Sequence, residues 1–423
     1  MFWCKKGATR LWFFDQSLSW VLQTKLLSAG LILACIGAFF DLNAQPKEQR
    51  VTEDFIPRVQ YSNCFKIEKK AKLLKLHVLS DCLSPKDSSN QPGSQLDYAD
   101  QGARSYVLIP RESKLLKSYQ PSLREVVVPI PLTRVVVTST TILPYFEILG
   151  LIPQVKGFSK AGYIYSPKFR QALKQGNLVE VGPEHPIQIE KIFPLNPQAI
   201  FNYPLGGPST WELHPAFQKS GILTIRHTDY LETHPLGRAE WIKFIGFLFG
   251  KEKQAYHYFD SLAIKYNQLK NWVAQNKGTS CPHVLTGSLY GGVWHVPGGK
   301  SFTARLIKDA GACYLWKDNQ QTGGVPLALE EVLKQALTAD VWINAGSWQS
   351  LDEMRQSDTR YSLFKSYKKG FVYNPLNRST QGGGLDIYEW GAAHPHLVLK
   401  DLISVFHPSL LKNYKKIWYR KVS

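Results

Sequence analysis

Between residues 133 and 235 the hydrophobic pattern switches repeatedly between that of a buried strand and that of a helix. RVVVTST at 134–140 is an unbroken β-branched run, which fits a strand buried on both faces. TILPYFEILGL at 141–151 follows with the three- and four-residue spacing of a helix face. The alternation returns at 189–203 and 220–235, so we predict an α/β lobe over residues 133–235.

Residues 236–277 carry a longer helical pattern. Apolar residues recur at three- and four-residue spacing, and no proline interrupts the segment. Glycine disfavours a helix interior, so the helix could break at Gly250-Lys251. We therefore expect either one long helix or two abutting helices. Strand and helix patterns then alternate again, which predicts a second α/β lobe over residues 278–423.

The N-terminus has the pattern of an export signal. Residues 26–40 form an uncharged, mainly apolar run that follows several basic residues, and this run is too short for a comfortable membrane span. We expect a signal peptide over residues 1–44, cut after Ala44. Alternatively, Ile-Leu-Ala-Cys could act as a lipobox, which would make Cys35 a lipidation site. A third possibility is an uncleaved anchor; the first two place the protein in the periplasm or cell envelope.

Residues 45–132 differ from both lobes. Short alternating runs such as FKIEKKAKLLKLHVLS at 65–80 predict antiparallel strands, and a polar stretch at 84–104 reads as a flexible loop between them. The expected plan is therefore a mainly β extension before two Rossmann-like α/β lobes with a long helix between them. The predicted boundaries are 1–44 for the signal peptide, 45–132 for the extension, 133–235 for the first lobe, 236–277 for the bridging helix and 278–423 for the second lobe.

The composition fits folded units with a sizeable core, since 423 residues are 44% hydrophobic and 13% aromatic. A formal net charge of +18 would suit nucleic acid, an anionic membrane surface or an anionic ligand. The basic residues are scattered, however, and those of the densest group, at 66–77, alternate with apolar residues, as on the solvent-exposed face of one strand or helix. We therefore do not expect nucleic acid as a partner.

Four cysteines lie beyond the predicted signal peptide: Cys64, Cys82, Cys281 and Cys313. An oxidising compartment would permit disulfides, and Cys64 and Cys82 could pair because they sit near the two ends of one alternating segment. No Cys-x-x-Cys and no histidine cluster with zinc spacing is present, so no metal site is expected.

Motifs for phosphate binding and catalysis are missing. GGKS at 298–301 resembles the end of a Walker A loop, but that loop needs glycine where the chain has Trp294. The sequence also lacks Gly-x-Ser-x-Gly, His-Glu-x-x-His and a paired-carboxylate motif with context. We therefore do not expect an enzyme.

Residues 133–409 resemble the periplasmic solute-binding proteins of ABC importers for iron-siderophores, haem and cobalamin. The order and spacing of several short segments carry the resemblance, namely RVVVTSTT, YFEILGL before VKGFS, IQIEKIFPLNPQAIF, the helical segment at 239–276 and VPGGKSFTARLIKDAGACYLW. One departure is Asn-Pro-Gln at 196–198 where the family usually has Lys-Pro-Asp. The extension has no counterpart in the smallest members of the family.

The resemblance implies a fold of two α/β lobes bridged by one rigid helix, with a ligand cleft between the lobes. It implies capture of an iron-siderophore, haem or corrinoid-type ligand and its delivery to an ABC permease dimer in the membrane. The protein would be a monomer and would carry no cofactor besides this ligand. A basic chain favours an anionic chelate over neutral cobalamin.

A bulky chelate is best held by aromatic faces, with cations matching its carboxylates or phosphate. Residues of these types on expected strand-to-helix loops, or at the start of the bridging helix, are the ligand-binding candidates: Tyr163, Tyr165, Arg238, Tyr290, Trp294, Arg378 and Trp390. Trp294 could equally be a core residue of its lobe.

The resemblance also implies one permease-docking glutamate per lobe, each at the start of a surface helix. The matching positions are Glu190 and Glu330, and Glu331 could replace its neighbour. A glutamate in a first helical turn is also favoured by the helix dipole, so ordinary helix stabilisation is the alternative interpretation. Two other functions stay open: a metal or haem hand-over protein that uses no transporter, and an exported signalling module that kept the fold but lost the ligand.

Overall fold

The computed structural model describes residues 56–70, 73–79, 104–183, 187–202 and 214–423. The predicted signal peptide, the lipidation candidate Cys35 and the predicted disulfide partner Cys82 lie outside the described residues. In the described part of the chain, no helix is long and apolar enough to cross a membrane.

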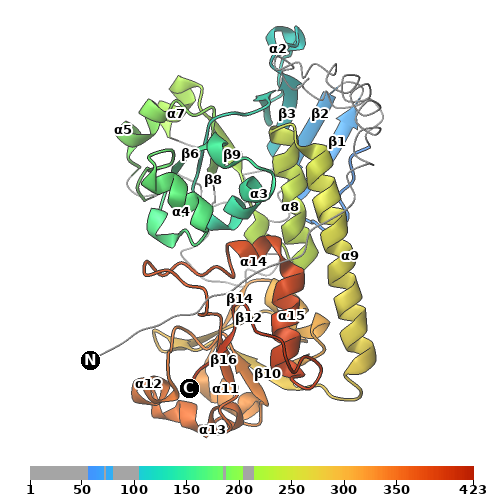
Figure 1. The fold of residues 1–423 in the computed structure, drawn as a ribbon, viewed down its shortest axis with the longest axis vertical. Helices are drawn as coiled ribbons and strands as arrows, with labels where there is room; N and C mark the ends of the chain where they lie inside the picture. The colour runs from blue at the N-terminus through green and yellow to red at the C-terminus, as the bar shows by residue number, and fades with distance from the viewer. Residues whose placement is uncertain (1–55, 71–72, 80–103, 184–186, 203–213) are drawn as a thin grey trace, which may run out of the picture. The chain divides into compact units, whose positions relative to one another are not determined.

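The first α/β lobe is built on a parallel sheet, as its β-branched runs predict. Its five strands follow the order β7-β6-β5-β8-β9, and every neighbouring pair is parallel. The strand bounds are β5 Val135–Val137, β6 Val155–Phe158, β7 Val179–Glu180, β8 Ala199–Asn202 and β9 Leu223–Arg226. The helices of this lobe, shown in green in Figure 1, are α3 Leu143–Ile148, α4 Pro167–Lys174, α5 Ile189–Ile192 and α7 Pro215–Ser220.

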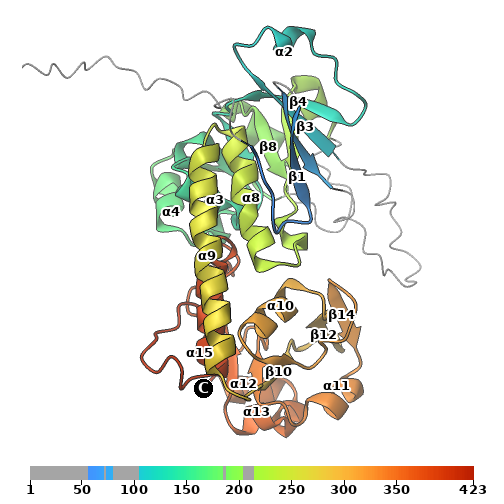
Figure 2. The ribbon, with the colours of Figure 1, turned by 90° about the vertical axis from the view of Figure 1, so that its right-hand side faces the viewer.

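Two helices follow, α8 (Pro235–Leu248) and α9 (Glu252–Asn276). They are separated by Gly250, whose positive φ of 65° is a left-handed conformation that glycine adopts at low cost. All 14 residues of α8 are buried, so α8 is a core helix. The 25-residue α9 alone runs on to the second lobe, as Figure 2 shows.

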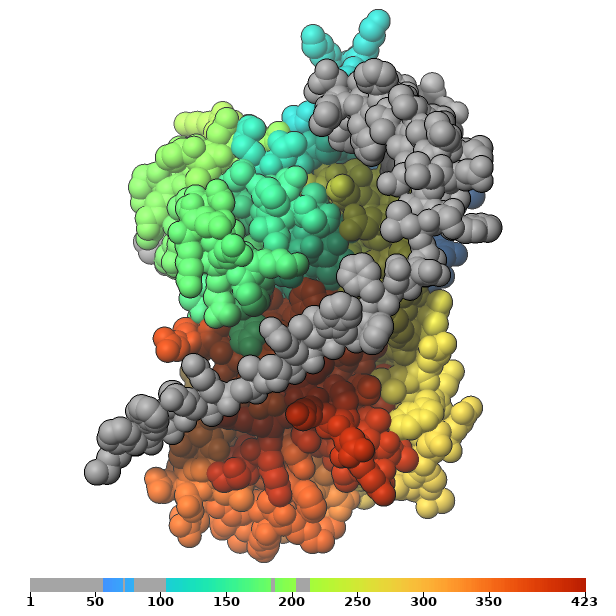
Figure 3. Space-filling model, viewed as in Figure 1, coloured from blue at the N-terminus to red at the C-terminus, as the bar shows by residue number. Residues whose placement is uncertain are grey.

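The second lobe has a five-stranded sheet, β13-β10-β15-β16-β17, with only β17 antiparallel, and a separate antiparallel sheet, β11-β12-β14. The strands are β10 His283–Thr286, β11 Leu289–Tyr290, β12 Val293–Pro297, β13 Cys313–Tyr314, β14 Gly324–Leu327, β15 Val341–Ile343, β16 Val372–Asn374 and β17 Arg420–Lys421. The helices are α10 Phe302–Asp309, α11 Leu329–Ala336, α12 Leu351–Ser357, α13 Lys365–Lys368, α14 Trp390–Ala393 and α15 Pro395–Phe406. In the space-filling view this lobe is orange to red, and α9 is yellow (Figure 3).

The N-terminal extension forms a four-stranded sheet in the order β1-β2-β3-β4, with bounds β1 Phe65–Lys70, β2 Leu73–Val78, β3 Arg104–Pro110 and β4 Glu125–Ile130. The expectation of antiparallel strands throughout was wrong for the last pair. β3 and β4 are parallel because the connection between them, which includes the short helix α2 (Leu115–Ser118), returns the chain to the same end of the sheet. Phe65 packs on Trp241 and Phe244 of α8, with ring centroids 4.9 and 5.8 Å away.

Two buried glutamates fix the chain just before β1. The Glu240 carboxylate on α8 accepts the backbone N–H groups of Gln60, Tyr61 and Ser62 at 2.7–2.9 Å. Glu232 accepts the N–H of Asn63 at 3.0 Å, and burial raises the pKa of Glu232 to about 7. The extension is therefore part of the same folded unit as the lobes.

A disulfide joins Cys281 to Cys313 at the amino-terminal edge of the second lobe, where Cys313 lies in β13 and Cys281 lies shortly before β10. The sequence spacing gave no reason to pair these two cysteines, because 32 positions separate them. Parallel pairing of β10 with β13 brings them together. Cys64 is fully buried.

Candidate ligand-binding site

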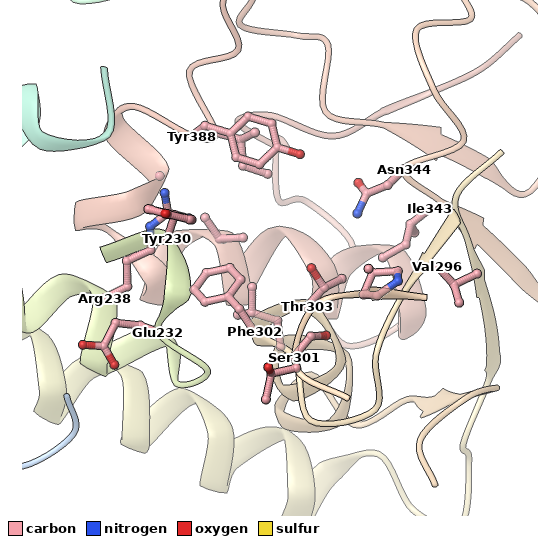
Figure 4. Close-up of a pocket in the computed structure, with 18 of the residues that line it drawn as sticks. Tyr230, Glu232, Arg238, Val296, Ser301, Phe302, Thr303, Ile343, Asn344 and Tyr388 are labelled. Atoms are coloured by element: carbon pink, nitrogen blue, oxygen red, sulfur yellow. The ribbon is translucent and has the colours of Figure 1, made fainter. Parts of the chain in front are cut away.

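A cavity of about 550 Å³ lies between the two lobes, a volume in the usual range for small-molecule sites. Four residues at or just before the start of α8 line it on the side of the first lobe: Tyr230, Leu231, Glu232 and Arg238. The second lobe supplies the remaining walls from β12, residues 301–306, residues 322–324, the end of β15, α15 and the four residues Ile387, Tyr388, Gly391 and Tyr419. We call this cavity the inter-lobe pocket (Figure 4).

One wall of the pocket lies at the carboxyl end of the parallel strand β15, and ligands of open α/β sheets usually bind beyond such strand ends. Asn344 directly follows β15 and has a positive φ of 55°, a conformation that asparagine tolerates better than most residues. Its side-chain oxygen accepts a hydrogen bond from the Tyr419 hydroxyl at 3.0 Å. This bond fixes a polar amide on the pocket wall beside Ile343.

Aromatic rings form two facing sides of the pocket. Phe302 is the first residue of α10, and the preceding Ser301 caps the helix by accepting the N–H of Ala304 at 3.2 Å. Tyr388 lies across the pocket from Phe302 in Figure 4 and is 51% exposed. A ligand that entered between these rings would gain apolar contact on both faces.

Arg238 places a buried cation at one end of the pocket. Its Nε donates to Asp229 at 2.8 Å, and only 8% of Arg238 is exposed. Asp229 also accepts the Thr141 hydroxyl at 3.0 Å. Burial opposes ionisation of Asp229, but Arg238 and His227 outweigh it and hold the pKa of Asp229 well below its usual value.

The same guanidinium contacts the second lobe. Its carbon lies 5.5 Å from the centroid of the Phe302 ring, within the range of a cation–π contact. Arg238 is thus the one ligand-binding candidate from the sequence that lines the inter-lobe pocket among the described residues. Asp229 holds the Arg238 guanidinium in place, and the contact with Phe302 connects this guanidinium to the second lobe.

Four other candidates lie near a contact between the lobes. The guanidinium of Arg378 stands 4.8 Å from the Tyr165 ring centroid and pairs with Asp386 at 2.7 Å. Trp390 stacks on His394 with centroids 4.0 Å apart, at the start of α14. Tyr163 is on the same loop as Tyr165 and is half-exposed. None of the four is among the residues that line the pocket. Arg378 and Tyr165 instead contact each other where the second lobe packs on the 160–166 loop of the first.

The candidates Trp294 and Tyr290 do not line the inter-lobe pocket. Trp294 is 0% exposed, its indole N–H donates to the Thr286 carbonyl at 2.9 Å, and its ring stacks on Trp342 at 5.5 Å. Because side chains alternate along β12, Trp294 points into the core of the second lobe. This placement agrees with the alternative interpretation of Trp294 as a core residue. Tyr290 is 82% exposed at the β11–β12 turn, away from the pocket.

Sequence reasoning missed four aromatic or polar residues that line the pocket: Tyr230, Phe302, Asn344 and Tyr388. Tyr388 stands two positions before the candidate Trp390, and Phe302 directly follows the GGKS segment at 298–301. These neighbouring positions are the signal that could have indicated Tyr388 and Phe302. Asn344 had no signal, because a lone asparagine after a strand is common.

The proposed docking glutamates are placed where a partner could reach them. Glu190 is exposed in the first turn of α5 on the first lobe, and Glu330 is exposed in the first turn of α11 on the second. Glu331 is exposed beside Glu330. In the described residues, no group of histidine, cysteine or acidic side chains could hold a bare metal ion.

Comparison with known proteins gives the family. The family model described as periplasmic binding protein matches residues 135–374. An uncharacterized lipoprotein of Methanocaldococcus jannaschii is 30% identical over 304 residues, which cover 70% of each chain.

Solved structures show the same fold at low identity. A periplasmic heme binding protein of Pseudomonas aeruginosa has a TM-score of 0.52 and 18% identity, covering 69% of this chain and 98% of that one. A possible iron-binding periplasmic solute-binding protein of Staphylococcus epidermidis has a TM-score of 0.52 and 16% identity, covering 66% of this chain and all of that one. The family match over more than half of the chain, together with two α/β lobes bridged by α9, shows that this protein belongs to the periplasmic binding protein family.

Proposed function

We propose that the protein captures an anionic metal chelate, of the haem or iron-siderophore type, in the inter-lobe pocket and delivers it to an ABC permease in the membrane. The observation that carries this proposal is the pairing of facing aromatic residues, Phe302 and Tyr388, with a buried guanidinium, Arg238, in one cavity between the lobes. The pocket matches a ligand with a large apolar or flat body and a negatively charged edge.

The chemistry of the lining narrows the ligand class. Phe302 and Tyr388 offer ring faces, while Arg238 offers hydrogen bonds and charge to a carboxylate. Tyrosine is an established ligand of haem iron, and Tyr388 lines the pocket, although burial raises the pKa of its hydroxyl and so opposes the phenolate form. The heme binding protein of Pseudomonas aeruginosa has the same fold, which supports haem as the first candidate. A neutral corrinoid would make less use of Arg238.

The ligand is tested by titrating the purified protein with haemin, a ferric catecholate, a ferric hydroxamate and cobalamin, following the absorbance of each chromophore. We expect saturable binding of an anionic chelate, weakened at least about tenfold in Arg238→Gln and in Phe302→Ala. Tyr290→Ala, which removes an exposed ring away from the pocket, is the matched control and should bind normally. Equal affinity in all variants would place the ligand elsewhere, and absence of binding across the panel would favour a signalling module.

For delivery, we propose that Glu190 and Glu330 pair with basic residues of the two permease subunits. Each is an exposed glutamate at the start of a helix, one on each lobe, which suits a two-fold partner. Charge reversal of both should abolish ligand uptake into cells or proteoliposomes while binding to the free protein stays unchanged. Reversal of Glu180 and Asp352, two exposed acids elsewhere on the lobes, should leave uptake intact. Normal uptake by the Glu190 and Glu330 variant would refute this docking mode.

We also propose that the protein works in the cell envelope as a monomer. The lipoprotein of Methanocaldococcus jannaschii supports a lipid anchor at Cys35, while cleavage after Ala44 is the alternative. Mass spectrometry of the exported protein separates the two, because lipidation leaves Cys35 as the first residue and cleavage leaves Gln45.

A further inference from the structure

A second groove lies on the other side of α10. Its volume is about 890 Å³, and we call it the basic groove. Phe302, Thr303 and Leu306 of α10 line the inter-lobe pocket, whereas Ala304, Arg305 and Lys308 line the basic groove. Ser301 lines both. One helix therefore separates two cavities of different character.

The lining of this groove is strongly cationic. Five basic side chains contribute to it: Lys277, Lys300, Arg305, Lys308 and Lys317. Asp318 is the one carboxylate among the described residues that line it. Lys300 belongs to the GGKS segment, so this segment supplies a cation to the groove even though the Walker A arrangement is absent.

Two of the five cations have local partners. Arg305 pairs with the buried Asp309, and the Lys277 amine donates to the Ser280 carbonyl at 2.8 Å. Lys300, Lys308 and Lys317 form no ion pair with any residue that the structure describes. Three amines around one cavity therefore stand outside any ion pair among the described residues.

The groove also lies at a junction. One wall consists of Gln60, Tyr61 and Asn63 from the segment before β1, together with His234 at the start of α8. The opposite wall belongs to the second lobe and is fixed by the Cys281–Cys313 disulfide, both of whose residues line the groove. Burial, and next to it the charge of Arg305, lowers the pKa of His234 to about 4, as expected beside a cationic surface.

We propose that the basic groove binds a multivalent phosphate-bearing anion. The cations outside ion pairs are lysines, whose ammonium groups act as point charges on flexible stems and are established phosphate binders. Several such charges around one cavity suit an anion whose charge is spread over many oxygens. A bound anion would contact the second lobe and the segment before β1 at once. This site is independent of the ligand in the inter-lobe pocket.

The test is calorimetric titration of the full chain with inorganic tripolyphosphate at low ionic strength. We expect saturable binding that weakens with added salt and that falls at least about tenfold in Lys300→Ala/Lys308→Ala. Lys334→Ala/Lys368→Ala removes the same charge from exposed positions on α11 and α13, and should bind as the wild type does. Circular dichroism and chelate binding check that both variants fold. Equal binding in the two double variants would overturn the proposal.

Two further arms separate the sources of phosphate. Sedimentation with phosphatidylcholine vesicles, with and without phosphatidylglycerol, tests a lipid headgroup as the source. Binding to anionic vesicles alone, lost in Lys300→Ala/Lys308→Ala, would assign the groove to a lipid, and binding of tripolyphosphate alone would assign it to a soluble anion. Citrate carries several carboxylates, and equal affinity for citrate would overturn the assignment to phosphate. Failure of both phosphate probes would also overturn it.

Discussion

The Glu389 carboxylate of the second lobe accepts the backbone N–H of Tyr165 of the first lobe at 2.7 Å. It also accepts the N–H of Ser166 at 2.8 Å, and nearby the Thr380 hydroxyl donates to the Gly162 carbonyl at 2.7 Å. The lobes are thus joined across the 160–166 loop as well as by α9. Tyr388, next to Glu389, lines the inter-lobe pocket, so this contact also fixes one wall of the site.

The first prediction concerns the pH dependence of this contact. Burial raises the pKa of Glu389 to about 7 from an ordinary 4.5, although the two N–H groups oppose the shift. The folded chain then binds more protons than the unfolded chain between these values, so the contribution of Glu389 to stability falls as pH rises from about 4.5 to 7. Glu389→Gln should therefore gain stability relative to the wild type across this window, by up to about 3 kcal/mol.

Urea unfolding of both proteins at several pH values measures this difference, and contributions from histidines cancel in the comparison. Glu180→Gln changes an exposed carboxylate on β7 and should show no such trend. A difference between the wild type and Glu389→Gln that stays constant from pH 4.5 to 8 would contradict the raised pKa of Glu389.

The second prediction concerns the buried pair Glu240 and Lys243, both 0% exposed. The Lys243 amine donates to Glu240 at 2.7 Å and to the Arg58 carbonyl at 3.1 Å. Glu240→Ala would leave this buried amine without its counter-charge and three backbone N–H groups without their acceptor, which should cost about 3–5 kcal/mol of unfolding free energy. Replacing both members, as in Glu240→Gln/Lys243→Met, should cost less than Glu240→Ala.

Denaturant unfolding gives these free energies, and limited proteolysis shows whether the segment before β1 detaches first. Glu68→Ala, on the exposed side of β1, is the control. If Glu240→Ala unfolds like the wild type, the carboxylate does not anchor the segment.

The third prediction separates core aromatics from pocket aromatics. Trp294→Ala removes a fully buried ring stacked on Trp342, and should lower the unfolding free energy by about 3–5 kcal/mol. It should leave chelate affinity nearly unchanged when measured well below the melting temperature. Phe302→Ala should do the reverse, with a large loss of affinity and a smaller loss of stability. The opposite pattern would return Trp294 to the ligand site.

The fourth prediction concerns the Cys281–Cys313 disulfide, which closes a loop across 32 positions. By the chain-entropy argument, Cys281→Ser/Cys313→Ser should lower the unfolding free energy by about 4 kcal/mol. Because both cysteines line the basic groove, the double variant should also weaken anion binding there. Calorimetric melting and tripolyphosphate titration measure the two effects. Unchanged melting under oxidising conditions would show that the bridge does not form.

Much of the fold could be predicted from the sequence, because strand and helix periodicity are local. The β-branched run around Val135–Val137 became a central parallel strand, and the helical pattern at 236–277 became α8 and α9 with Gly250 between them. The parallel pairing of β3 with β4 could not be predicted, because the direction of pairing depends on where the connection returns the chain.

The sequence by itself also determined that Arg238 would stand at the start of a helix near the cleft, because a helix start can be recognised from the chain alone. Only the tertiary structure decided which aromatics line the inter-lobe pocket. Trp294 and Tyr388 are both large aromatics near loops, yet strand register turns Trp294 into the lobe core, while packing of the second lobe on the 160–166 loop leaves Tyr388 beside the pocket. A one-residue change in register reverses the side that a strand residue faces, and the hydrophobic pattern of so short a strand does not fix that register.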